Sequence, residues 1–212
     1  MGVLTGAKEN NLKIIEITTY RLESSYSDKR HPENIKFADN IHDDLMRRDF
    51  TINAMAFKID SVKIFKTKVK ASGTLVDLYN GQNDLAQGLI KAVRDPNERF
   101  NEDALRMLRA IRFADQLNFK IDKATELAIK SNAKNLKFIS GERIRDEFIK
   151  IVMSNAGAKS IIRLEKCDLL QYLIPELINS IGVGQNLHHI YTVYEHLINS
   201  FDYAVKQNFS LE

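Results

Sequence analysis

The polar side chains with the clearest chemistry are Asp103 and Arg106, three positions apart in RFNEDALRMLRAIRFA. A carboxylate offers only hydrogen-bond acceptors and a guanidinium only donors. Side by side, they match the amino group and the neighbouring ring nitrogen of cytosine or adenine. Uracil and guanine present a carbonyl and an N–H there, which would leave buried contacts unpaired at about 1–3 kcal/mol per group. The pair can therefore select C and A over U and G.

A single helix is expected to carry this pair. Asn101 is the expected N-cap, after a turn at Pro96 and Asn97. At 100° per residue, one face is apolar and consists of Ala104, Met107, Leu108, Ile111 and Ala114. Another face is charged and consists of Glu102, Asp103, Arg106 and Arg109. Solvated ion pairs between neighbouring turns are the alternative explanation for that charged face.

A second charged group is Arg47-Arg48-Asp49, which ends an expected short helix at 41–48. Two guanidinium groups at a helix C-terminus complement the helix dipole, which is a purely structural role. They also match phosphate oxygens, and Asp49 can accept from a ribose hydroxyl. The segment FTINAMAF that follows is expected to pack internally, with Asn53 as its one polar side chain.

The first part of the chain is expected to contain strands. LKIIEITTY, residues 12–20, is rich in β-branched residues and predicts a strand that carries Glu16, whose alternative is a solvent-facing side chain. Residues 21–40 are expected to form a loop in which Arg30 and His31 could approach phosphate. Residues 59–80 predict a hairpin with its turn at Ser72-Gly73. A short helix at 84–87 and a strand at 90–93 follow.

Beyond Asp95 the pattern is helical throughout, so a domain boundary is expected near 93–100. Helices are predicted at 122–133, from Gly141 onward with Ser140 as N-cap, at 157–175 in two pieces, and at 186–208. The last would carry His189 and His196 on one face. An exposed histidine helix is the favoured interpretation there, and a metal site the other.

The composition fits a globular protein outside membranes. Apolar content of 44% and charged content of 28% exclude a disordered chain, and no apolar run of about 18 residues appears. The lone Cys167 cannot form an internal disulfide, so a reducing cytoplasm is expected. The net charge of +3 is compatible with RNA binding but does not demonstrate it.

Four segments in this order resemble class II tRNA nucleotidyltransferases, which are the CCA-adding enzymes and their bacterial poly(A) polymerase relatives. They are IIEITTYR, RRDFTINAMAF, RFNEDALRMLRAIRFA and SGERIRDEFIK, and they span residues 12–154. The resemblance implies an α+β fold with an incomplete polymerase β-like nucleotidyltransferase head at 1–92. A helical neck with the base-reading helix is then expected at 93–154, and part of a helical body at 155–212.

The resemblance also implies roles for individual residues. Arg48 and Asp49 would hold phosphate and ribose, Asp103 and Arg106 would read the base with Arg109 beside them, and Glu16 would be the catalytic carboxylate that binds Mg²⁺. The residues expected to support this set are Arg47, Asn53, Glu102, Glu142 and Arg143. The implied reaction is the transfer of CMP and AMP from CTP and ATP to the 3′ end of tRNA.

The sequence departs from the family pattern in one respect. It contains neither the Asp-x-Asp pair nor the Gly-Gly turn that serve the family's two-metal centre. The chain is therefore expected to be a fragment, or the product of a split or decayed gene, with little activity alone. Two alternatives stay open: a poly(A) polymerase that uses ATP only, and a non-catalytic nucleotide- or tRNA-binding module. A following His-Asp phosphohydrolase domain is a further possibility, and the oligomeric state is not readable.

Overall fold

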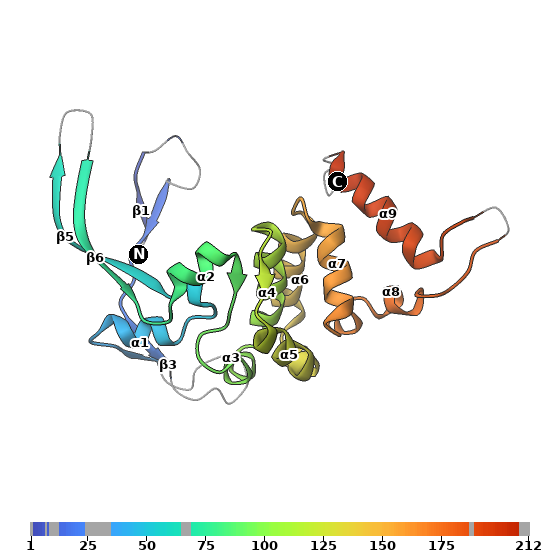
Figure 1. The fold of residues 1–212 in the computed structure, drawn as a ribbon, viewed down its shortest axis with the longest axis horizontal. Helices are drawn as coiled ribbons and strands as arrows, with labels where there is room; N and C mark the ends of the chain where they lie inside the picture. The colour runs from blue at the N-terminus through green and yellow to red at the C-terminus, as the bar shows by residue number, and fades with distance from the viewer. Residues whose placement is uncertain are drawn as a thin grey trace.

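The computed structural model describes residues 2–6, 8, 13–23, 35–64, 69–186 and 189–207, without the side chains of residues 21–23, 35–36 and 69. All structural statements below concern these residues. The three strand hairpins lie at one end of an elongated molecule, helices are stacked in the middle, and α9 lies at the other end (Figure 1). The predicted strand-containing first part is confirmed, and the described remainder is helical except for the short strand at 120–121.

The described strands pair two by two and do not merge into a larger sheet. The antiparallel pairs are β1 (Gly2–Leu4) with β2 (Ile14–Glu16), β3 (Arg21–Glu23) with β4 (Ile35–Phe37), and β5 (Met55–Ile64) with β6 (Val69–Asp77). The parallel pair is β7 (Leu89–Ile90) with β8 (Lys120–Ile121). The prediction of a loop over residues 21–40 is thus wrong at 21–23 and 35–37, which are strands. Arg30 and His31 lie outside the described residues.

The long β5–β6 hairpin confirms that a hairpin forms in this segment, but the predicted turn is wrong and the paired strands differ from those that it implied. Gly73 lies within β6 opposite Ile59, next to a register shift between Ile59 and Ser61. A Cβ atom on Gly73 would be 2.0 Å from the carbonyl oxygen of Lys58. This glycine therefore permits a close backbone approach beside a bulge and does not form the hairpin turn.

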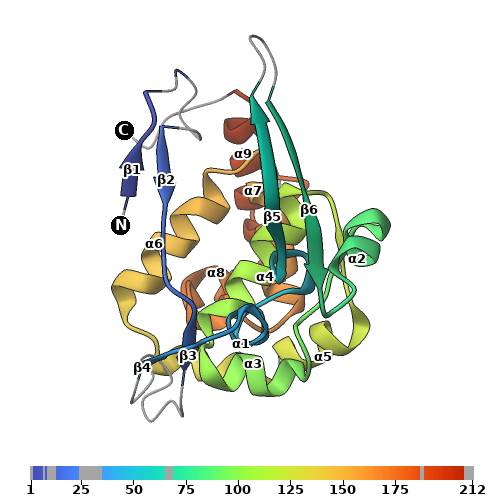
Figure 2. The same cartoon turned by 90° about the vertical axis from the view of Figure 1, so that its left-hand side faces the viewer.

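The helices follow the predicted order. Those before residue 120 are α1 (Ile41–Met46), the 3₁₀ turn Thr51–Asn53, α2 (Gly81–Gln87), α3 (Pro96–Glu102) and α4 (Leu105–Gln116). Those after it are α5 (Lys123–Asn132), the 3₁₀ segment Ala133–Phe138, α6 (Gly141–Val152), α7 (Gly157–Lys166), the 3₁₀ turn Leu170–Tyr172, α8 (Pro175–Asn179) and α9 (Val193–Lys206). Figure 2 shows α4 with α1, α3 and α6 around it and the β5–β6 hairpin nearer the viewer.

The single helix expected from Asn101 is in fact two helices, which corrects the prediction. Asp95 caps α3, and its carboxylate accepts from the backbone N–H of Asn97 at 2.7 Å. Asn101 lies inside α3. Asp103 then adopts an extended conformation, with φ −145° and ψ 104°, and its side chain accepts from the N–H of Leu105 at 3.1 Å. Asp103 therefore separates the two helices.

The apolar face of α4 forms the centre of the core, as predicted. Its five expected members, Ala104, Met107, Leu108, Ile111 and Ala114, are all fully buried. The helix packs on α6 and α7, and the same core includes Phe50 and Ile90 from the strand-containing part. One hydrophobic core thus joins the two parts and fixes the charged edge of α4 relative to α1.

Two expectations about later helices need correction. Ser140 precedes α6 but makes no capping hydrogen bond, and its hydroxyl is buried without a partner. α9 begins at Val193, after a Thr192 capping box, so His189 precedes the helix that carries His196. No three metal-ligating side chains gather anywhere in the described part of the chain. Nor does any helix there have the length and apolar character needed to cross a bilayer.

Candidate functional site

A polar cleft of about 500 Å³ lies where the C-terminal end of α1, the α3–α4 break and α6 meet. Its lining residues are Arg47, Arg48, Asp49, Asn53, Asp103, Leu105, Arg106, Arg109, Phe113 and Arg143. Five arginines against two aspartates give the lining a formal charge of +3. Such a volume suits a small organic ligand, and the charge favours an anionic one.

Arg106 is held in the wall of this cleft by both neighbouring helices. Its guanidinium donates to the carboxylate of Glu102 at 2.7 Å and to the carbonyl oxygen of Arg47 at 3.0 Å. A longer bond of 3.3 Å reaches the carbonyl oxygen of Arg99. Three of its five N–H donors are thus used, and two are left for a ligand.

Asp103 lies beside Arg106 on the cleft wall and is fixed from two sides. One carboxylate oxygen accepts from the N–H of Leu105, and the other accepts from Arg143 on α6 at 2.7 Å. The side chain of Asp103 keeps 19% of its surface exposed, compared with 10% for Arg106. The acceptor and the donor therefore both reach the cleft, although they do not share one continuous helix.

Arg109 connects α4 to the segment that follows α1. Its Nε and Nη2 atoms both lie 2.7 Å from one oxygen of Asp49. The other oxygen of Asp49 accepts from Asn53 at 3.2 Å. The guanidinium of Arg109 also lies 5.1 Å from the ring centre of Phe113, which packs edge-on against Phe50. Arg109 is thus fixed between a carboxylate and an aromatic ring.

Arg47 and Arg48 are organised by a buried acid that sequence reasoning did not single out. Asp44 accepts from Arg47 at 2.6 Å and from Arg48 at 2.9 Å. Burial opposes ionisation of Asp44, but the hydrogen bonds and charges of the two arginines outweigh it and hold the pKa of Asp44 below its ordinary value. The side chain of Arg48 is still 45% exposed, so it remains accessible at the cleft mouth.

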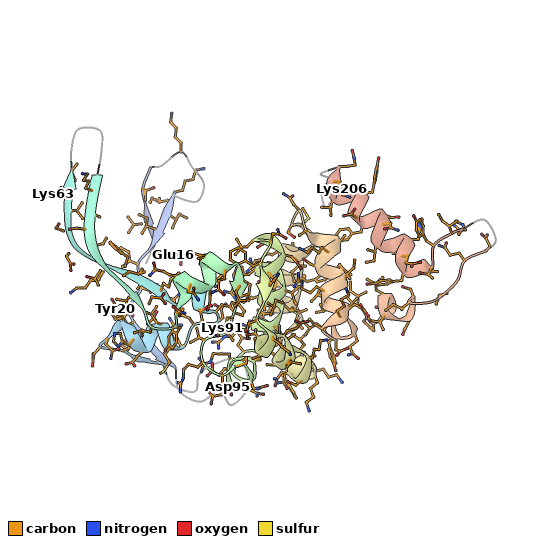
Figure 3. All side chains as sticks on the ribbon, in the orientation of Figure 1. Glu16, Tyr20, Lys63, Lys91, Asp95 and Lys206 are labelled. Atoms are coloured by element: carbon orange, nitrogen blue, oxygen red, sulfur yellow. The ribbon has the colours of Figure 1, made fainter. Side chains whose placement is uncertain are left out.

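The cleft gathers most of the residues singled out in the sequence. Those that line it are Arg47, Arg48, Asp49, Asn53, Asp103, Arg106, Arg109 and Arg143. Glu102 lies behind them, between Arg99 and Arg106. Glu142 is exposed on α6 and is not among the lining residues. Glu16 is exposed on β2 (Figure 3), likewise outside the lining.

Two functional neighbours escaped the sequence reasoning. Arg99 is only 6% exposed and binds the carbonyl oxygen of Met46 at 3.0 Å, so it joins α3 to the end of α1. Phe113 was not among the residues singled out in the sequence, but it lines the cleft. The Arg-Phe-Asn-Glu-Asp run contained Arg99, but nothing in its spacing indicated a partner 53 positions away.

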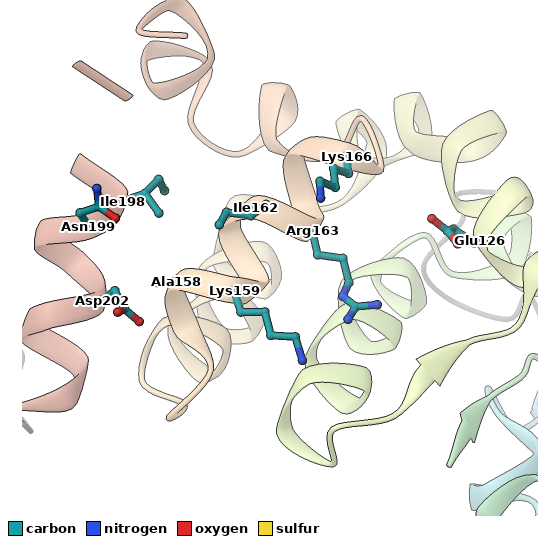
Figure 4. Close-up of a pocket in the computed structure, with 9 residues that line it drawn as sticks. All are labelled: Glu126, Ala158, Lys159, Ile162, Arg163, Lys166, Ile198, Asn199 and Asp202. Atoms are coloured by element: carbon teal, nitrogen blue, oxygen red, sulfur yellow. The ribbon is translucent and has the colours of Figure 1, made fainter. Parts of the chain in front are cut away.

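A slightly larger cavity of about 540 Å³ lies between α7 and α9 (Figure 4). Two of its basic residues are already engaged, because Arg163 and Lys159 lie 2.9 and 3.5 Å from the buried carboxylate of Asp115. Ser160 donates to the same carboxylate at 3.0 Å. These contacts join α7 to α4, so the cavity gathers structural ion pairs and not a convergent set of free donors.

Comparisons with known proteins agree along most of the chain. Residues 2–91 match the family described as the poly(A) polymerase head domain, and residues 118–181 match the probable RNA and SrmB-binding site of polymerase A. The CCA-adding enzyme of Lactobacillus helveticus is 51% identical over 136 residues, which are 64% of this chain and 31% of that protein. That of Limosilactobacillus reuteri is 48% identical over 150 residues, or 69% and 34%. This chain thus spans about a third of the length of these relatives.

Solved structures show the same similarity. The Bacillus stearothermophilus CCA-adding enzyme in complex with CTP aligns with a TM-score of 0.63 and 31% identity, covering 81% of this chain and 37% of that one. An apo form of a CCA-adding enzyme aligns with a TM-score of 0.66 and 28% identity, covering 94% and 50%. The Thermotoga maritima CCA-adding enzyme complexed with tRNA aligns with a TM-score of 0.54 and 27% identity, covering 81% and 45%.

Proposed function

The chain belongs to the family of tRNA nucleotidyltransferases and bacterial poly(A) polymerases, and on that premise we propose that its arginine-lined cleft selects CTP and ATP for CCA addition to tRNA. One observation carries the proposal. The acceptor of Asp103 and the donor of Arg106 line the same cleft as Arg48 and Asp49. A base and its phosphates can therefore be held at once.

In this proposal Asp103 and Arg106 read the base. The two remaining N–H donors of Arg106 would face the ring nitrogen or carbonyl acceptor of cytosine. Each oxygen of Asp103 makes one hydrogen bond to the protein, so lone pairs remain to accept from the base amino group. Uracil and guanine would set a carbonyl against the carboxylate. Selection then comes from the penalty for unpaired polar groups and not from pocket size.

The remaining arginines would hold the triphosphate and the sugar. Arg48 has the most exposed side chain of the five arginines that line the cleft, at 45% compared with 34% for Arg109, the next most exposed. Its guanidinium can turn toward phosphate oxygens while Arg47 stays on Asp44. Asp49 would accept from a ribose hydroxyl through its Arg109-bound oxygen, because Asn53 and the backbone N–H of Phe50 already occupy the other oxygen.

The complete reaction belongs to a longer protein, since the chain spans about a third of its curated relatives. In that protein the RNA 3′-hydroxyl would attack the α-phosphate of CTP or ATP, and pyrophosphate would leave. We propose a head at 1–92, a neck at 93–154 and part of a body at 155–212. The tRNA 3′ end would approach through the segment that matches the RNA-binding family, residues 118–181. A cytoplasmic location stays a prediction.

Divalent metal ions, with Mg²⁺ as our proposal, would serve the transfer step in the longer protein. The described residues do not fit this role by themselves, because no three metal-ligating side chains gather among them. Glu16, exposed on β2, would be the contribution of this chain, and further carboxylates would be needed. No step of the reaction is therefore assigned to residues of the described part.

The proposal is tested by titrating the purified chain with CTP and measuring the heat of binding. Arg106→Ala should weaken CTP binding at least tenfold, because it removes the donor to the base, while Glu102 keeps its bond to Arg99. Arg145→Ala, an exposed arginine on α6 outside the cleft, is the matched control and should change little. Equal affinities of the two variants would remove Arg106 from nucleotide binding.

Two other functions have specific support. Residues 2–91 match the family described as the poly(A) polymerase head domain, so an enzyme that uses ATP alone is the second candidate, and terminal-addition assays of the complete enzyme with each nucleotide would distinguish it. The missing metal cluster in the described part favours a non-catalytic nucleotide- or tRNA-binding module. Release of pyrophosphate by the complete enzyme would exclude that module.

A further inference from the structure

Every acid that lines the cleft is already bound to an arginine. Asp49 accepts from Arg109 through one oxygen and from Asn53 through the other. Asp103 accepts from Arg143 at 2.7 Å. A carboxylate in this state is poorly suited to ligate a cation, since the cation would have to displace a guanidinium that already satisfies it.

The acids behind the cleft wall are neutralised in the same way. Asp44 and Glu102 are each shared by two arginines. The pairs are Arg47 and Arg48 on Asp44, and Arg99 and Arg106 on Glu102. Counting cleft and wall together, six arginines face four acids, a formal excess of two positive charges. The cleft therefore attracts anions and repels cations.

Glu16 does not change this balance. It lies on the exposed β1–β2 hairpin, is not among the residues that line the cleft, and has no cluster of metal-ligating neighbours in the described ranges. Among the described residues that line the cleft, guanidinium groups are thus the cationic groups that face a bound triphosphate.

We infer that this chain binds the triphosphate of its nucleotide through arginine alone, without a divalent cation. The inference rests on the proposed nucleotide binding and concerns how the phosphates are neutralised. At about pH 8, free CTP carries about four negative charges, and its Mg²⁺ complex carries about two. A site with excess positive charge should prefer the more negative form. Nucleotide binding at the cleft and metal binding for the transfer step are then separate properties.

The test is a titration of the full chain with CTP in EDTA and again in excess MgCl₂, with ionic strength matched by NaCl. Free CTP should bind as tightly as the Mg²⁺ complex or up to about tenfold more tightly. Tightening by Mg²⁺ of more than twofold would overturn the inference while leaving the proposed nucleotide binding intact. If CTP binds under neither condition, the proposed function itself fails.

Two charge variants sharpen the test. Arg48→Gln removes an exposed positive charge at the cleft mouth and should lower affinity for free CTP more than for its Mg²⁺ complex. Arg145→Gln removes the same charge from α6 outside the cleft and should have at most a small, equal effect on both forms. Equal losses of CTP affinity in the two variants would show that only the total charge of the protein affects binding, which would contradict the inference. If Mg²⁺ tightens binding and Glu16→Gln abolishes the gain, the metal is bound by this chain and the inference is wrong.

Discussion

The arginine cleft and the two N-terminal hairpins are built in opposite ways. Around the cleft, fully buried side chains of α4 support a set of charged residues that bind one another across α1, α3 and α6. On the β1–β2 and β5–β6 hairpins, large apolar side chains such as Leu4, Ile15 and Ile59 remain between 54 and 82% exposed. Two-stranded hairpins with exposed faces gain little stability from burial.

This difference separates the residues that we propose select the nucleotide from the residue that we propose binds metal. The geometry that we propose selects the nucleotide is fixed by contacts among α1, α3, α4, α6 and residues 49–53, and none of the residues that line the cleft lies on a hairpin strand. The metal-binding geometry would require the hairpins, where Glu16 is exposed without ligating neighbours among the described residues. We therefore expect nucleotide selection to be separable from the transfer step.

The largest expected effect is on stability. Leu108→Ala should lower the free energy of unfolding by about 2–5 kcal/mol, because it opens a cavity under the charged edge of α4. Ile59→Ala on β5, where the side chain is 58% exposed, should change it by less than about 0.5 kcal/mol. Urea denaturation followed by circular dichroism measures both. Equal losses would mean that the hairpin and the helices form one cooperative core.

The next effect is on base selection. Asp103→Asn keeps the shape but replaces one acceptor with a donor, which opposes the amino group of cytosine. Discrimination between CTP and UTP should fall about tenfold, as expected for one lost hydrogen bond in a partly buried site. Asp146→Asn, an exposed aspartate on α6, is the control. Unchanged discrimination in Asp103→Asn would exclude Asp103 as the acceptor.

A smaller effect is expected when Asp103 is kept but loses its support. Arg143→Gln removes the bond to the second oxygen of Asp103 and should weaken CTP binding about threefold to tenfold. Arg145→Gln, two positions along the same helix, controls for the change in charge. Titration with CTP and UTP reports both affinity and selectivity. If affinity falls and selectivity does not, Arg143 contacts phosphate instead of positioning Asp103.

The smallest expected effect is on the stability of the fold at low pH. The pKa of Asp44 is depressed in the folded protein, so ionised Asp44 adds stability that is present above its unfolded pKa and lost as pH falls through the folded value. The urea midpoint should therefore decline below about pH 4, and Asp44→Asn should reduce this decline. An identical acid response in both proteins would show that the two arginines do not stabilise the ionised form.

Sequence periodicity correctly predicted the buried face of α4, because apolar spacing follows directly from helix geometry. It could not predict the break at Asp103, since a carboxylate there is equally compatible with a continuous helix and with an N-terminal cap. The turn at Ser72-Gly73 failed for a related reason: Gly73 serves a close approach to Lys58, which is a tertiary contact. The arginine positions in the cleft were readable from their motifs, but their partners, such as Asp44 for Arg48, were not.

The central claim is that Asp103 and Arg106 together imitate a complementary base. The most direct measurement is the affinity of the purified chain for CTP, ATP, UTP and GTP under one set of conditions. We predict that CTP and ATP bind at least about tenfold more tightly than UTP and GTP, as unpaired buried groups require. Equal affinity for all four nucleotides would contradict the claim.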